Sequence, residues 1–186
     1  DEAPTAKKLL QLRKEVYANA RSIECDAGGA AHGHLGLIMP DADFIALGGG
    51  AIAWVDPAHP GAFVVPVGTT GVQLAVLQMT HKDEKHAYRS FLNVEAKLKR
   101  QILEAVPNEY LNALEDPTHG FSEVTPAEML EHLTATYGTV TPEDLEENEE
   151  ALSTEWNPTT PTETVFDNAA KTMAFANEAG EAIPNT

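Results

Sequence analysis

Apolar positions recur at helical spacing in several parts of the chain, and this recurrence predicts a mainly α-helical protein. The first helix is expected over residues 5–22, and a second helical element over residues 34–47, where Pro40 and nearby glycines weaken the pattern. A long helical pattern covers residues 69–106, with a lapse of the apolar stripe near 80–83 where the helix can kink or break. The stripe of the first helix consists of Leu9, Leu12, Val16 and Ala20.

The last third of the chain repeats one helix-start signal three times. In each copy a Thr at the N-cap precedes a Pro at the first helical position and an acidic residue two positions later. The copies predict helices that end at Gly138, before Pro158 and at Gly180, with both glycines as left-handed C-caps. Three short helices with tight linkers predict a small bundle. The signals begin at Thr125, Thr141 and Thr160.

Two short β-favouring runs interrupt the helical pattern. Residues 51–55 and 62–67 are separated by a Pro- and Gly-containing turn at 56–61, which predicts a β-hairpin or an extended flap. Prolines at 57, 60 and 66 exclude a central strand, so the hairpin is expected at an edge or alone. Trp54 has little core of its own there, so we expect it to pack on the helices or on another subunit.

The 186 residues are enough for one good-sized domain or two small lobes. A division is expected near residues 116–121. It gives an N-terminal helical lobe, residues 1–117, with the hairpin near 51–67, and an acidic C-terminal three-helix lobe, residues 118–186.

Charge is distributed unevenly between these lobes. The net charge of the chain is −17; residues 1–100 carry 11 basic and 11 acidic residues, whereas residues 101–186 carry 1 basic and 18 acidic residues. An acidic segment of this kind repels phosphate backbones and is not expected to bind nucleic acid by itself. It is either a solvated helical surface or a surface that meets a basic partner.

The compartment and membrane expectations follow from composition. The longest apolar runs, such as residues 62–67, are far shorter than the roughly 20 residues of a membrane span, and no targeting signal is visible. Cys25 is the single cysteine and excludes an internal disulfide, which favours a reduced, cytoplasmic compartment.

His32 and His34 form the most suggestive metal-binding pair. Zinc needs a third protein ligand, which only Cys25, Asp26, His59 or His119 could supply, and the glycines around His34 are more typical of a turn. We therefore interpret both histidines as structural or solvent-exposed, and expect no metal or other cofactor.

No other motif predicts catalysis. The glycines at 28–29 and 48–50 lack the residues of a phosphate-binding loop, and Cys25 lacks the context of a nucleophile. The acidic run 143–150 is interpreted as the solvated face of a helix. The chain is not expected to be an enzyme, and no catalytic or cofactor-binding residue is assigned.

Several short motifs, taken in order, resemble a known family. The chain is similar to the Gag-like proteins of copia-type LTR retrotransposons, as found in diatoms and other marine algae. The similarity covers about residues 10–183, and the motifs that carry it lie at residues 20–23, 28–39, 57–61, 105–111, 130–138, 156–158 and 163–166.

The resemblance implies a two-lobed, helical capsid-type fold, with the proline-rich β-hairpin as an insertion. It also implies a structural subunit that self-assembles into particles or filaments. Such a subunit belongs either to a retrotransposon or to a copy that a host has adopted. RNA would be enclosed through a basic or Cys-His region that this chain does not contain. The alternative function is a monomeric acidic helical module that recruits a basic protein.

Overall fold

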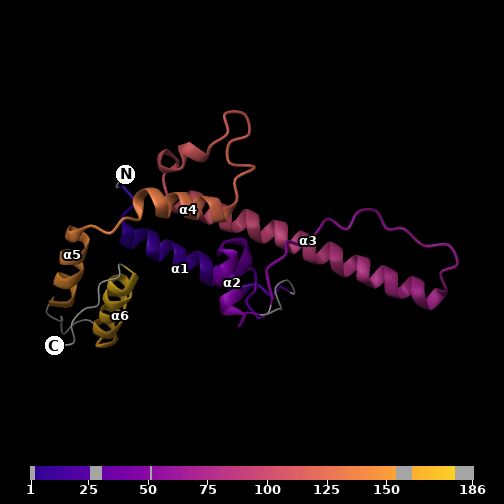
Figure 1. Cartoon of the computed structure of the whole chain (residues 1–186), viewed down its shortest axis with the longest axis horizontal. Helices are drawn as coiled ribbons and strands as arrows, with labels where there is room; N and C mark the ends of the chain where they lie inside the picture. Colours follow the sequence, from indigo (N-terminus) through magenta and orange to yellow (C-terminus); the bar gives the residue numbers. More distant parts are fainter. Residues whose placement is uncertain (1–2, 26–30, 51, 154–160, 179–186) are drawn as a thin grey trace. The chain divides into compact units, whose positions relative to one another are not determined.

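The computed structural model describes residues 3–25, 31–50, 52–153 and 161–178 (Figure 1). Within these residues 66% are helical and no strand is present, so the expectation of a mainly α protein is confirmed. The α-helices are α1 (Ala6–Ser22), α2 (Asp41–Leu47), α3 (Gly71–Ala105), α4 (Pro126–Tyr137), α5 (Pro142–Ser153) and α6 (Glu163–Glu178). Short 3₁₀ turns are η2 (Leu35–Leu37), η3 (Asn108–Tyr110) and η4 (Asn112–Leu114).

The described residues belong to two compact units. One contains residues 12–132, and the other contains residues 3–11 together with residues 133–153 and 161–178. In the second unit α5 packs against α6, and the buried amide of Asn148 on α5 donates a hydrogen bond to the carbonyl oxygen of Thr172 on α6 (2.9 Å).

Helix α1 follows its apolar stripe. All four predicted stripe residues, Leu9, Leu12, Val16 and Ala20, are at most 7% exposed, so this prediction is confirmed. The end of the helix is closed by the chain that follows, because the backbone N–H of His34 donates to the carbonyl oxygen of Ala20 (2.9 Å).

The expected helix over residues 34–47 is divided into two pieces. The 3₁₀ turn η2 comes first, and Pro40 then precedes α2, whose first turn carries Asp41 and Asp43. Proline has no N–H to donate and restricts the residue before it, so a continuous helix could not pass through this point.

Helix α3 is 35 residues long and continues without interruption through residues 80–83. Thr70 caps it: the Thr70 hydroxyl accepts from the backbone N–H of Gln73, and the Gln73 side chain accepts from the N–H of Thr70. Its buried residues all lie in the C-terminal half, at Phe91, Val94, Leu98 and Ile102. The stripe lapses near 80–83 because the helix leaves the core there, and no break is needed.

The predicted β-hairpin is wrong. Residues 52–67 contain no strand, and the chain runs instead as an irregular extended segment beside the N-terminal half of α3, towards the start of that helix (Figure 1). Three prolines remove N–H donors that a two-stranded ladder would require, and Gly61 adopts a φ of 69°. Side-chain contacts with α3 replace the missing ladder.

Two of the three predicted helix starts are confirmed by capping boxes. Thr125 exchanges hydrogen bonds with Glu128, and Thr141 with Asp144, at the starts of α4 and α5. The third helix, α6, begins at Glu163, two residues later than expected, and Thr160 lies outside the described residues.

Of the three predicted helix ends, one has a different cap from the one expected and two lie outside the described residues. Gly138 closes α4 with a hydrogen bond from its N–H to the carbonyl oxygen of Thr134 (3.0 Å), but its φ is not positive, so the left-handed C-cap predicted there is wrong. Residues 154–157, over which the second helix was expected to continue, and Gly180 lie outside the described residues.

Candidate functional site

Trp54 is seated directly on the backbone of Gly36. A Cβ atom placed on Gly36 would overlap the Cβ, Cγ and Cδ2 atoms of Trp54, so only glycine leaves room for the indole. Further rings surround this seat, with His34 and Phe44 at 6.1 and 5.7 Å from the Trp54 ring. Of the two alternatives that the sequence left open for Trp54, packing on the helices or on another subunit, the structure shows the first.

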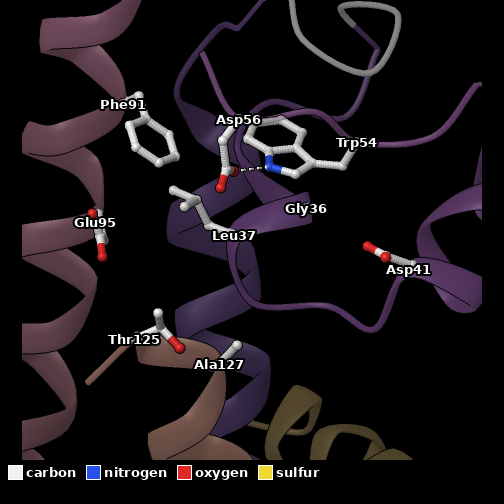
Figure 2. Close-up of a pocket in the computed structure, with 9 residues that line it drawn as sticks. All are labelled: Gly36, Leu37, Asp41, Trp54, Asp56, Phe91, Glu95, Thr125 and Ala127. Atoms are coloured by element: carbon white, nitrogen blue, oxygen red, sulfur yellow. Dashed lines mark hydrogen bonds between the residues drawn. The ribbon is translucent and has the colours of Figure 1, made fainter. Parts of the chain in front are cut away.

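Asp56 fixes the orientation of the indole. The Nε1–H of Trp54 donates to Oδ1 of Asp56 at 2.7 Å (Figure 2). A hydrogen bond to a charged acceptor is roughly twice as strong as a neutral one, so it holds the indole and the carboxylate as one unit.

A pocket of about 350 Å³ lies beside this unit. Figure 2 shows Asp56 between the Trp54 indole and two side chains of α3, Phe91 and Glu95. The remaining lining residues are Gly36, Leu37, Asp41, Thr125 and Ala127, so the walls combine two aromatic rings with three carboxylates and carry no basic side chain.

The segment before α3 is held to the helix by aromatic contacts. The His59 ring meets Tyr88 edge-on at 5.1 Å, and the Phe63 ring meets His81 at 5.2 Å. The N–H of Gly61 donates to Nδ1 of His59 (3.0 Å), which shapes the turn between these two contacts.

We call residues 52–81 the apolar arm; it comprises this segment and the first three turns of α3. Fourteen large hydrophobic side chains are exposed among the described residues, and nine of them lie in the arm. On α3 the exposed ones follow helical spacing, since Val72, Val76 and Met79 are 78, 60 and 68% exposed. Those of the preceding segment are Ile52, Val55, Phe63, Val64, Val65 and Val67.

The arm is also almost free of charge. Asp56 is its single charged residue, and residues 57–81 contain no Asp, Glu, Lys or Arg in a chain whose net charge is −17. Exposed apolar side chains concentrated in one nearly uncharged stretch of chain are typical of an interaction site.

The histidines expected to be structural occupy apolar or turn positions. His34 is 1% exposed, its Nδ1 lies 3.1 Å from the carbonyl oxygen of Ile23, and its Nε2 has no partner within the described residues. His32 lies edge-on against Phe44 at 6.0 Å. His59 and His119 lie in separate turns, at Gly61 and Asp116.

No group of three His, Cys, Asp or Glu side chains within the described residues is arranged to hold a metal ion. Asp26, one of the third ligands considered from the sequence, lies outside them. Cys25 is partly buried.

The acidic run of α5 presents its charges outward, as interpreted from the sequence. Glu143, Glu146, Glu147, Glu149 and Glu150 are exposed, whereas Asn148 is the buried residue of the run.

No protein-family model, curated protein or solved structure matches the chain. Among the helices that the structure describes, none combines the length and apolar character needed to cross a membrane.

Proposed function

We propose that the chain is a structural subunit that associates with copies of itself, as expected for a Gag-like capsid subunit of a retrotransposon or a host-adopted copy of one. The observation that carries the proposal is the apolar arm. It gathers most of the exposed large hydrophobic side chains of the described residues into 30 consecutive residues that hold one charge.

The lack of charge favours a second copy as the occupant of the arm. Two chains of net charge −17 repel each other wherever their acidic surfaces meet. An uncharged apolar surface is where two copies can approach most closely without that repulsion, and burying it removes apolar side chains from water.

The size of the arm also fits an interface between copies. A stable protein interface buries about 800 Å² on each partner and uses roughly 20–30 residues a side. The arm supplies 30 residues, and the stripe of Val72, Val76 and Met79 is suited to packing against a second helix.

Light scattering of the purified chain tests self-association. We expect oligomers whose mass increases between low and about 0.5 M salt, because salt screens the repulsion between acidic surfaces. Electron microscopy of the same samples should show regular particles or filaments. Monodisperse monomers at every salt concentration would contradict the proposal and favour a monomeric module.

A further inference from the structure

The pocket beside Trp54 contains negative charge without a partner. Glu95 is half-buried on α3, and neither Glu95 nor Asp41 makes a hydrogen bond or an ion pair within the described residues. A partly buried carboxylate without a partner is costly, and an incoming cation would remove that cost.

Asp56 adds a second carboxylate in a fixed orientation. Its Oδ1 accepts from the Trp54 indole, which leaves its other oxygen available to a ligand. Figure 2 shows Phe91 and Glu95 on α3, with Asp56 between this helix and the Trp54 indole, and both carboxylates line the same pocket.

The spacing of the carboxylates and the aromatic rings of the pocket favour a guanidinium group over a metal ion. Asp41, Asp56 and Glu95 are not grouped closely enough to ligate a single metal ion, since the described residues contain no such group. A guanidinium group is broader and planar; it pairs with carboxylates through several N–H donors and stacks on aromatic faces such as those of Trp54 and Phe91.

We propose that this pocket binds the arginine side chain of another protein segment, with the guanidinium group between Asp56 and Glu95 and against the aromatic rings. The cavity of about 350 Å³ admits a side chain and is small for a folded element. The carboxylates would repel a phosphate group, so the ligand is a basic peptide segment and not a nucleic acid.

A fluorescence titration tests the proposal in a Trp156→Phe chain, where Trp54 is the only tryptophan. The probes are three acetylated and amidated tripeptides, Gly-Arg-Gly, Gly-citrulline-Gly and Gly-Lys-Gly. We expect a saturable change with the arginine peptide and about tenfold weaker binding of the uncharged citrulline peptide. Equal binding of arginine and citrulline, or no saturable change, would overturn the site.

Two glutamate variants on the same helix provide the matched comparison. Glu95→Gln should weaken binding of the arginine peptide by about tenfold, whereas Glu84→Gln, on an exposed part of α3 outside the pocket, should leave it unchanged. Circular dichroism confirms that both variants are folded. Equal effects of the two substitutions would contradict the site, and a lysine peptide that binds as tightly as the arginine peptide would overturn the assignment to arginine.

Discussion

Gly36 and Trp54 are in such close contact that Trp54 occupies the space that a side chain at position 36 would need. The contact joins the 3₁₀ turn η2 to the start of the apolar arm. Asp56 and the pocket depend on the same contact, because the indole that Gly36 admits is the one that bonds Asp56.

Gly36→Ala should therefore displace Trp54. We expect a loss of about 1–3 kcal/mol in the free energy of unfolding, since an added methyl group in a packed site forces its neighbours to move. Gly71→Ala is the control: nothing lies within 4 Å of its new Cβ, and alanine favours the helix there. Urea unfolding followed by Trp54 fluorescence, with both variants made in the Trp156→Phe chain, measures both. Equal stability of the two variants would show that the indole does not need Gly36.

Gly33 supports the end of α1 in a different way. Its φ is +55°, and a Cβ atom there would lie 2.6–2.8 Å from the carbonyl oxygens of Arg21, Ile23 and Ala20. Gly120 has a similar φ of +59° but open space around it.

Gly33→Ala and Gly120→Ala should each lose about 1 kcal/mol in the free energy of unfolding, because alanine is strained in a left-handed backbone conformation. Only Gly33→Ala should lose about 1–3 kcal/mol more, because backbone atoms obstruct its methyl group. Thermal or urea unfolding of the two variants gives this difference directly. If they are destabilised alike, the close approach at Gly33 is not a constraint.

The capping box at the start of α4 predicts a pH dependence. Hydrogen bonds from the backbone and hydroxyl of Thr125 hold the pKa of Glu128 below its usual value. The charged carboxylate therefore stabilises the folded chain above the usual glutamate pKa. This contribution is lost as the pH falls through the lowered folded-state pKa.

Glu128→Gln keeps the shape of the box and removes the titration. We expect it to be less stable than the unsubstituted chain by under about 1 kcal/mol at about pH 7, because the group is exposed and screened. The difference should shrink as the pH falls from neutral through the lowered pKa of Glu128. Urea midpoints across this range measure it, and a difference that does not change with pH would exclude the carboxylate as its source.

Asn148 predicts a strong effect in the unit that contains α5 and α6. Asn148→Asp has nearly the same size but turns the donor that faces the Thr172 carbonyl into an acceptor and places a charge in a buried site. A loss of about 3 kcal/mol or more is expected at about pH 7, with partial recovery in acid as the carboxyl is protonated. Glu146→Gln, on the exposed face of α5, is the control. Far-ultraviolet circular dichroism during unfolding gives the comparison, and an unchanged Asn148→Asp chain would contradict the packing of α5 on α6.

The sequence predicts those parts of the fold that local patterns determine. The stripe of α1 and the capping boxes at Thr125 and Thr141 depend on residues within four positions of one another, and they form as expected. For residues 52–67 the sequence left a β-hairpin and an extended flap open, and the hairpin is wrong. Local pattern cannot decide between them, because the segment depends on contacts with residues far along the chain, such as that of His59 with Tyr88.

In the candidate site, too, local sequence indicates some residues, while others are brought in only by the fold. Trp54 was singled out from the sequence because its own segment offers it little core. Glu95 was not, because it lies 41 positions later and looks like any surface carboxylate of a helix. The nearly charge-free run 57–81 was readable from composition, but its exposure became visible only in the structure.

Sedimentation velocity of arm variants tests the central claim, that the apolar arm joins copies of this chain, most directly. Val76→Ser changes an exposed valine in the arm, and Val165→Ser changes an exposed valine on α6, so the two substitutions are chemically identical. We predict that Val76→Ser shifts the chain towards monomer at every salt concentration while Val165→Ser sediments as the unsubstituted chain does. Equal sedimentation of all three chains would contradict the account.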